Sequence, residues 1–345
     1  MAARSKPHSV DALIVGAGPA GLTAALTLAR QQQTSIVFDA GTYRNDAADY
    51  MHLIPGFDHV HPSEFRAAAR QNILSNYGQI SFEKAVVSSV EKDASTNSFS
   101  LTDKTGKTWK GKKLVLANGV EDIYPDIDGY SECWGKGMYV TLPISITNEL
   151  SRVVLTFTSF HCLFCKGYEE RGRPSAGVLA IGGLSKAPVA LHVARQVSAL
   201  SDSVTFYTNG SEEVGRDIEA GFGTATAMKI DTRKIKCISK HSNRAGVSIE
   251  FEDGSSIVEA FLAHTPGTKV RGPFAEQMGL ALAPSGDIKA GPPFYETNIK
   301  GVFAAGDNCG IIKNVPHAIF SGSLAGMGVA SQIMAEALGQ KPLFG

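Results

Sequence analysis

The sequence is poor in several features that would point to particular classes of protein. Five cysteines in 345 residues are too few for the disulfide framework of a secreted scaffold, and their odd number leaves at least one unpaired. Lysine plus arginine and aspartate plus glutamate both number 33, so no excess of one sign attracts the chain to nucleic acid or to an anionic membrane. Residues 1–10 lack the apolar core of a secretory signal. We therefore expect a cytoplasmic protein that has no membrane-spanning helix and binds neither nucleic acid nor membrane.

Glycine, by contrast, is abundant, and its placement near the N-terminus carries information. Residues 11–15 predict a strand, residues 16–21 read Gly-Ala-Gly-Pro-Ala-Gly, and the alanine- and leucine-rich stretch that follows predicts a helix. In this dinucleotide-binding fingerprint Gly16 permits a sharp turn, Gly18 lets the backbone approach a pyrophosphate, and Gly21 lets the helix pack closely on the strand. The N–H groups at the start of the helix would bind the phosphates.

The next predicted strand supplies the acidic residue that this fingerprint requires. Residues 35–38 form a short apolar run, and Asp39 follows at its end. A carboxylate in this position accepts hydrogen bonds from a ribose diol. This strand-loop-helix-strand unit could hold FAD or NAD equally well.

Two later segments favour FAD. Residues 301–307 predict a strand ending in Gly-Asp ahead of a long helix, and they resemble the second FAD motif of flavoproteins with two dinucleotide-binding domains. Residues 113–119 resemble the intervening strand motif of the same proteins, with Asn118 where threonine is commoner. The resemblance implies that FAD contacts both ends of the chain, at Gly16, Gly18, Pro19, Ala20, Gly21, Asp39, Ala40, Arg44, Asn45, Ala117, Gly119, Gly306 and Asp307.

A second strand and glycine turn, residues 176–188, looks like a nucleotide site that has lost its ligand. The three fingerprint positions hold Gly182, Leu184 and Ala187. Leu184 puts a branched side chain where a pyrophosphate needs bare backbone. The following strand ends in residues 207–210, Tyr-Thr-Asn-Gly, with no cation for a 2′-phosphate. We therefore expect that NADPH does not bind well.

Cys162-Leu-Phe-Cys165 is the segment that points most directly to redox chemistry. Two residues between cysteines allow a small, reversible disulfide ring. Zinc is the obvious rival, but a structural zinc site needs four ligands and no second pair is visible, so we predict no metal site. Two buried structural cysteines are the other alternative. We interpret the pair as redox-active.

Taken together, these motifs resemble the low-molecular-weight thioredoxin reductase family, and more closely its fungal dithiol-oxidase branch, whose members form the disulfide of epidithiodiketopiperazines such as gliotoxin. The likeness covers nearly the whole chain and is carried by residues 37–45, 129–134, 162–172, 207–210, 272–274 and 292–297. It implies an α/β fold with two Rossmann-like dinucleotide-binding domains, each a three-layer ββα sandwich. The implied FAD domain (1–125 and 260–345) is discontinuous, with an NADPH-domain-like insertion (126–259) that carries the cysteine pair.

The same resemblance implies an activity: FAD-dependent oxidation of a small-molecule dithiol to a disulfide by a homodimer, with O2 reduced to H2O2. Cys162 would exchange with the substrate, and Cys165 would lie against the flavin and pass on the electron pair. Two alternatives remain open, an NADPH-dependent reductase of thioredoxin or a small disulfide, and a flavin-binding protein without turnover.

The chain departs from the family pattern in two places. Lys166 stands where the family usually has an aspartate that serves as acid and base, so His161 or His317 could supply the base instead. Residues 140–160 intervene where the family passes almost directly from residue 139 to residue 161. They are either an extra loop over the substrate entrance or retained intron sequence.

Overall fold

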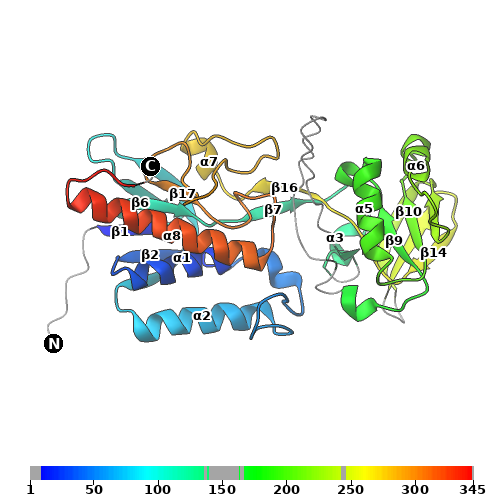
Figure 1. Cartoon of the computed structure of the whole chain (residues 1–345), viewed down its shortest axis with the longest axis horizontal. Coiled ribbons are helices and arrows are strands. Elements are labelled where there is room, and N and C mark those ends of the chain that lie inside the picture. The colour runs from blue at the N-terminus through cyan, green and yellow to red at the C-terminus, as the bar shows by residue number, and fades with distance from the viewer. Residues whose placement is uncertain (1–8, 136–137, 140–162, 164–166, 242–245, 344–345) are drawn as a thin grey trace. The chain divides into compact units, whose positions relative to one another are not determined.

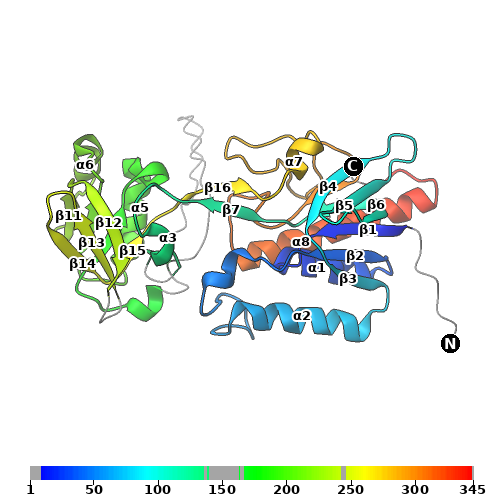
Figure 2. The same cartoon turned by 180° about the vertical axis from the view of Figure 1, so that it is seen from behind.

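The structure is a computed structural model and describes residues 9–135, 138–139, 163, 167–241 and 246–343. The chain divides into two units (Figures 1 and 2): the first consists of Met1–Asp46, Leu53–Glu121 and Lys269–Gly345, and the second of Ala47–His52 and Asp122–Thr268. The chain crosses between them within β7 (Val120–Ile123) and β16 (Gly267–Val270), which pair in a two-stranded sheet. The predicted crossings were at residues 125 and 260.

The first unit is built on a mixed sheet with the strand order β3-β2-β1-β6-β5-β4, and β17 also pairs with β6. β1, β2, β3, β6 and β17 run parallel, whereas β4 and β5 continue from β6 as an antiparallel meander. The strands are β1 (Val10–Val15), β2 (Ser35–Asp39), β3 (Ile80–Lys84), β4 (Val87–Lys92), β5 (Phe99–Asp103), β6 (Thr108–Leu116) and β17 (Val302–Ala304). β1, β2, β17 and the second half of β6 are apolar runs that are largely buried, which is typical of a sheet covered on both sides, whereas the edge strand β3 is more exposed.

Helices α1 (Pro19–Arg30), α2 (Pro62–Asn76) and α8 (Val315–Ala337) accompany this sheet, together with the short α7 (Phe274–Gln277) and the 3-10 turn η1 (Arg44–Ala47). α8 lies directly beside α1 (Figure 1). Glycines make this approach possible, since a Cβ on Gly322 would lie 2.2 Å from the carbonyl oxygen of Ala20. A Cβ on Gly326 would lie 2.9 Å from the Cβ of Thr27. The close packing of α1 on α8 joins the two chain ends that carry the predicted FAD motifs.

The second unit repeats the same plan. A parallel sheet with the order β11-β10-β9-β15-β8 is accompanied by a three-stranded antiparallel sheet, β12-β13-β14, and by helices. The elements are α3 (Tyr130–Cys133), β8 (Met138–Tyr139), η2 (Gly167–Glu170), β9 (Ala176–Leu179), η3 (Gly182–Ser185), α5 (Ala187–Val197), β10 (Val204–Tyr207), α6 (Glu212–Glu219), β11 (Met228–Asp231), β12 (Ile235–Lys240), β13 (Val247–Phe251), β14 (Ser256–Glu259) and β15 (Leu262–Ala263). Two Rossmann-like α/β units are therefore present, as predicted.

Helix α8 bears on the expectation that the chain has no membrane-spanning helix. It is long and apolar enough to meet the criterion for a membrane-crossing helix, with a mean hydropathy of 1.3 in its most apolar window. However, 56% of that window is buried inside the protein. The face of α8 that packs against α1 belongs to the core of the first unit, and the small and apolar residues of that face follow from this burial.

Candidate functional site

The loop between β1 and α1 is held by two glycines whose side-chain positions are already filled by backbone. Gly16 has a φ of +111°, and a Cβ there would lie 2.2 Å from the carbonyl oxygen of Ala117. A Cβ on Gly21 would lie 1.9 Å from the carbonyl oxygen of Gly16. Gly18 differs, because no atom of the described residues lies within 4 Å of the position that its Cβ would take. Packing therefore requires Gly16 and Gly21, whereas Gly18 presents bare backbone to open space.

The N-terminus of α1 has its backbone donors available for a ligand. Gly18 is the N-cap residue and offers no side-chain hydrogen bond, Pro19 begins the helix, and the first turn carries no acidic side chain. Ala20 is buried, and its Cβ lies 3.0 Å from the position of a Cβ on Gly306, so the C-terminal glycine motif reaches this end of the helix. Free N–H groups and the positive end of the helix dipole suit a pyrophosphate at this place.

Asp39 ends β2, and its carboxylate is surrounded by protein donors. Oδ1 accepts from the N–H of Gly41 at 2.9 Å and the hydroxyl of Tyr43 at 2.7 Å, while Oδ2 accepts from Arg70 Nη1 at 3.3 Å. Burial, and then the hydrogen bond to Asp39, raises the pKa of Tyr43 to about 12, so its phenol remains a donor at neutral pH. A carboxylate offers about four acceptor positions, which leaves one for a ribose hydroxyl. Ala40, the next residue, is exposed.

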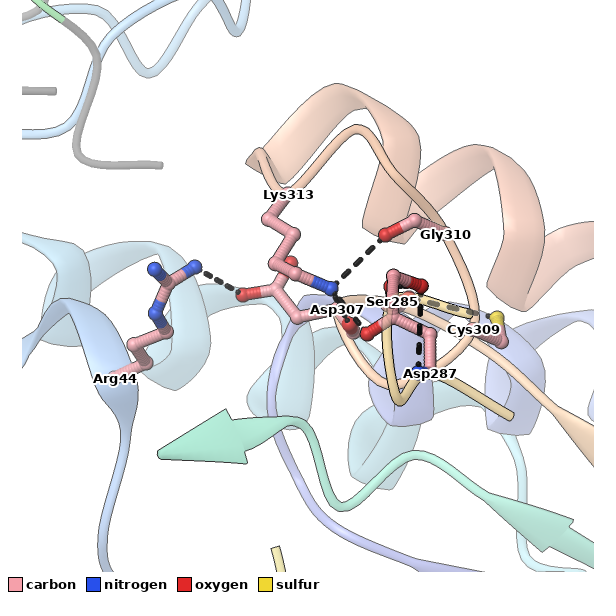
Figure 3. A network of polar contacts seen from close by, with 8 residues as sticks. Arg44, Ser285, Asp287, Asp307, Cys309, Gly310 and Lys313 are labelled. Atoms are coloured by element: carbon pink, nitrogen blue, oxygen red, sulfur yellow. Dashed lines mark hydrogen bonds and ion pairs between the residues drawn. The ribbon is translucent and has the colours of Figure 1, made fainter. Parts of the chain in front are cut away.

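Arg44 joins the first FAD motif to the last one. Its Nη1 lies 3.0 Å from Oδ2 of Asp307, although the two residues are 263 positions apart (Figure 3). Both side chains are largely buried. Beside Arg44, Asn45 accepts a hydrogen bond at Oδ1 from Arg66 Nη1 at 3.1 Å. The guanidinium thus neutralises the Asp307 carboxylate in the part of the site where a pyrophosphate would add further negative charge.

Residues Ala117 to Gly119 connect the end of β6 with the loop after β17. Asn308 donates from Nδ2 to Oδ1 of Asn118 at 2.8 Å and to the carbonyl oxygen of Leu116 at 2.9 Å. Asn308 has no exposed surface, and its Oδ1 has no hydrogen-bond partner among the described residues. Sequence reasoning did not identify Asn308, although its place directly after the Gly-Asp motif was an available signal.

A buried lysine also escaped the sequence reading. The ammonium of Lys313 lies 2.6 Å from Oδ1 of Asp287, 2.6 Å from the carbonyl oxygen of Asp307 and 3.0 Å from that of Gly310 (Figure 3). Its side chain has no exposed surface. No local pattern marks a lysine as buried, and Asp287 lies 26 positions earlier in the chain.

His317 lies in the first turn of α8, where the side chain of Asn314 accepts its N–H at 2.8 Å. Burial lowers the pKa of His317, so the imidazole is neutral at physiological pH. Nε2 lies 3.4 Å from the hydroxyl of Tyr295, and Nδ1 is buried with no partner among the described residues. The ring packs on Gly310, where a Cβ would lie 2.4 Å from Cε1. This imidazole can accept a proton.

These residues fit FAD, the cofactor that the motifs imply. The predicted contacts at Gly16–Gly21, Arg44, Ala117–Gly119 and Gly306–Asp307 come together within the first unit. The backbone N–H groups at the N-terminus of α1, next to Gly18, are available to a ligand, and the carboxylate of Asp307 is neutralised by Arg44. The backbone of Gly18 faces open space that a Cβ would occupy, as a pyrophosphate at the N-terminus of α1 requires.

The redox segment itself falls outside the described residues. His161, Cys162, Cys165 and Lys166 are not among them, nor is any of residues 140–160. Leu163 is described, and its side chain has no exposed surface within a core cluster of the second unit. Leu163, one of the two residues between the cysteines, is therefore anchored in that core.

The three other cysteines are all free and poorly suited to redox exchange. Cys133 and Cys309 are buried, and Cys237 is partly buried. Burial raises the pKa of Cys133 to about 11 and raises the pKa of Cys309 as well. Burial, and then the hydrogen bond to Glu250, raises the pKa of Cys237. Because the thiolate is the reactive form, a raised pKa makes these thiols poorer nucleophiles at neutral pH.

The structure overturns the steric argument against nucleotide binding in the second unit. η3 turns the side chain of Leu184 into the core, where it is 1% exposed. Gly182 and Gly183 are exposed, and no described atom lies within 4 Å of the position of a Cβ on either. α5 then begins at Ala187 without a side-chain cap. The turn therefore presents bare backbone although the central glycine of the fingerprint is absent.

The electrostatic argument is incomplete as well. Tyr207 is buried and donates its hydroxyl to Oε1 of Glu259 at 2.5 Å, and Asn209 accepts a backbone N–H with Oδ1 at 2.9 Å, so neither offers a charge. Lys234, which follows β11, lies with its Cδ 3.3 Å from the position of a Cβ on Gly210. The side chain of a lysine from outside residues 207–210 thus packs next to this turn, where the motif alone could not show it.

Comparison with known proteins identifies the family of this chain. A model of the pyridine nucleotide-disulphide oxidoreductase family matches residues 10–322. The thioredoxin reductase tcpT of Claviceps purpurea is 48% identical over 340 residues, which cover 99% of both chains. The thioredoxin reductase aclD of Aspergillus oryzae is 39% identical over 326 residues, which cover 94% of this chain and 96% of aclD.

Solved structures agree on the fold. An oxidoreductase from Agrobacterium tumefaciens superposes with a TM-score of 0.79 at 29% identity, over 94% of this chain and 99% of that one. A thioredoxin reductase from Giardia duodenalis gives a TM-score of 0.72 at 20% identity, over 94% and 99% of the two chains, a likeness of fold alone. The chain therefore belongs to the pyridine nucleotide-disulphide oxidoreductase family, as one of its thioredoxin reductase-like members.

Proposed function

We propose that this protein is an FAD-dependent oxidase of small-molecule dithiols, which forms a disulfide in its substrate and reduces O2 to hydrogen peroxide. The observation that carries the proposal is the Cys162-Leu-Phe-Cys165 pair, because the other three cysteines are free thiols of raised pKa. The anchoring of Leu163 and the fit of the first unit to FAD support it. The motifs shared with the dithiol-oxidase branch supply the substrate class.

The exchange steps follow from the chemistry of a vicinal disulfide. A substrate thiolate attacks Cys162, the bond between Cys162 and Cys165 breaks, and a mixed disulfide forms on Cys162. The second thiol of the same substrate molecule then attacks the substrate sulfur of the mixed disulfide and displaces Cys162, which releases a cyclic disulfide and leaves both cysteines reduced. A bound FAD would supply a two-electron carrier between the reduced pair and O2, and the two protons of the dithiol would leave with the electrons as part of hydrogen peroxide. The balance is one dithiol and one O2 consumed for one disulfide and one hydrogen peroxide.

The exchange needs a group that accepts the substrate's thiol protons, and His317 suits that role. Its buried imidazole is neutral at physiological pH, and Nδ1 has no partner among the described residues. His161 and Lys166, adjacent to the cysteine pair, are the other candidates. Replacing His317 with Asn, which keeps a polar side chain, should slow dithiol oxidation and remove the acidic limb of its pH profile. An unchanged profile would assign the proton to His161 or Lys166.

An NADPH-dependent disulfide reductase is the second candidate, and specific observations favour it. The curated relatives are named thioredoxin reductases. The backbone of Gly182 and Gly183 is open, and Lys234 lies beside the turn after β10. Poor binding of NADPH therefore stays a prediction from the sequence. The open backbone at Gly182 and Gly183 removes the steric reason for that prediction.

Oxygen uptake separates the candidates. The purified protein is supplied with a reduced gliotoxin-like dithiol in an oxygen electrode, and peroxide is measured alongside the loss of thiols. The proposal predicts equal amounts of oxygen consumed, peroxide formed and disulfide formed, without NADPH. Oxidation of NADPH driven by thioredoxin or a small disulfide, with no oxygen uptake from the dithiol, would establish the reductase. No turnover in either assay would leave a flavin-binding protein.

We also propose that the protein acts as a homodimer formed through α8. Exposed apolar side chains recur along this helix at Phe320, Met327 and Met334, at intervals that keep them on one face, and the C-cap residue Leu338 is exposed as well. No Lys, Arg, Asp or Glu occurs between Asn314 and Ala335. A second copy presents the same uncharged stripe, so two α8 helices can cover each other without burying an unpaired charge.

A further inference from the structure

The loop from Asp307 to Lys313 is folded around the ammonium of its own last residue. Lys313 donates to the carboxylate of Asp287 and to the carbonyl oxygens of Asp307 and Gly310, at 2.6, 2.6 and 3.0 Å. An ammonium has three donors, and all three are used. The second carboxylate oxygen of Asp287 accepts the hydroxyl of Ser285 at 2.8 Å. Figure 3 shows that these groups converge on the nitrogen from separate segments of the chain.

This arrangement fixes the orientation of two peptide groups. The carbonyls of Asp307 and Gly310 point inward to Lys313, and in a trans peptide the N–H lies opposite the C=O. The N–H groups of Asn308 and Ile311 therefore point away from the ammonium. In the described part of the chain neither N–H has a hydrogen-bond acceptor. Ile311 is exposed, whereas Asn308 has no exposed surface, so the loop displays the free N–H of Ile311 in the same segment as Asp307, whose carboxylate is held by Arg44.

We propose that Lys313 is a positioning residue for the flavin cofactor: its ammonium holds the carbonyls of Asp307 and Gly310 inward, so that the loop presents the free N–H of Ile311 and the Asp307 carboxylate to FAD. Asp287 is the counter-ion that lets this cation remain buried. The proposal rests on FAD binding by the first unit and does not depend on the identity of the dithiol or on the cysteine pair.

A double substitution separates positioning from simple charge compensation. Lys313→Met leaves the carboxylate of Asp287 buried and unpaired, so it should lower both the stability of the protein and its affinity for FAD. Combining Lys313→Met with Asp287→Asn removes both charges, and replacing a buried ion pair with neutral groups is often nearly neutral for stability. We expect the double variant to regain stability but still to bind FAD about tenfold or more weakly, because the two carbonyls remain unclamped.

Lys113 supplies the matched control. It is also a buried lysine of the first unit, and its ammonium lies 2.5 Å from Oε1 of Glu336, but its hydrogen bond involves no residue of the 307–313 loop. Lys113→Met should lower stability and leave the affinity for FAD unchanged.

The measurements are the free energy of unfolding and the dissociation constant of FAD, determined by titrating flavin-free, full-length protein. The visible absorption band at saturating FAD provides a second readout, which should differ from wild type in the double variant because the loop donor has moved. Recovery of wild-type affinity and spectrum by the double variant would show that Lys313 only neutralises Asp287 and would overturn the proposal. Equal loss of FAD affinity in Lys113→Met would overturn it too. Oxygen uptake plays no part in this test, so failure of the proposed dithiol oxidation would be seen separately.

Discussion

Alanine at Gly18 and alanine at Gly21 should have opposite consequences, although both residues belong to one glycine motif. Gly18 has a φ of −74°, which any residue adopts, and its Cβ would meet no described atom within 4 Å. The same methyl group would, however, occupy the space into which the bare backbone faces. Gly18→Ala should therefore spare the protein and weaken FAD binding.

The magnitudes follow from these two environments. At Gly18 the loss of a favoured N-cap residue and the lower entropy of the unfolded chain act in opposite directions, so stability should change by about 1 kcal/mol or less. Losing charge-assisted hydrogen bonds to a pyrophosphate should cost about 1.5–3 kcal/mol of binding, which is about tenfold to a hundredfold in affinity. At Gly21 the Cβ would lie 1.9 Å from a backbone oxygen, so the helix must shift, at a cost of about 3 kcal/mol or more in stability.

Urea unfolding of the flavin-free variants and titration with FAD, followed by quenching of flavin fluorescence, measure both quantities. The expected pattern is a stable Gly18→Ala that binds FAD poorly and an unstable Gly21→Ala. Wild-type FAD affinity in Gly18→Ala would refute the placement of the pyrophosphate over this residue. A marked loss of stability in that variant would refute the open space that the structure gives it.

Three further predictions concern the ion pair, pH and assembly. Arg44→Met leaves the largely buried carboxylate of Asp307 unpaired beside the pyrophosphate, so FAD retention in equilibrium dialysis should fall about tenfold or more, and normal retention would exclude a role for the pair. Burial lowers the pKa of His264 to about 3, so on acidification the unfolded chain takes up the proton before the folded protein does. The free energy of unfolding is therefore unaffected by His264 above pH 6.5, and below that pH it falls by up to about 1.4 kcal/mol per pH unit. His264→Gln should show a shallower decline in denaturation experiments between pH 6.5 and about 5, and an identical decline would contradict the assignment. Met327→Glu places a charge in the exposed stripe of α8 and should give half the wild-type mass in sedimentation while retaining FAD, whereas an unchanged dimer or a monomeric wild type would place the interface elsewhere.

Local motifs sufficed for those parts of the site that are contiguous in the chain. The turn at Gly16–Gly21 follows from the steric requirements of a strand, a tight loop and a helix, and six consecutive residues are enough to show those requirements. Asp39 and the Gly306–Asp307 pair are likewise marked by the strand ends that they follow. The pairing of the two chain ends was expected from the motif order alone, and the packing of α1 on α8 through Gly322 gives its physical basis.

The remainder depends on contacts between distant segments. The Arg44–Asp307 ion pair and the burial of Lys313 against Asp287 join positions that no local pattern relates. Leu184 shows a different limit: glycine spacing locates the turn, but the 3-10 conformation decides that its side chain enters the core. Lys234 reaches the turn after β10 from a neighbouring segment, so its charge was invisible to a reading of residues 207–210.

The central claim is that the Cys162–Cys165 pair carries electrons from a dithiol to FAD, and anaerobic spectroscopy tests it most directly. One equivalent of a reduced dithiol is added to the oxidised holoprotein under argon, and the visible flavin absorption is followed in wild type and in Cys162→Ser and Cys165→Ser. The account predicts bleaching in wild type, recovery of the band when oxygen is admitted, and no bleaching in either variant. Bleaching that persists in both variants, or that NADPH produces and the dithiol does not, would contradict it.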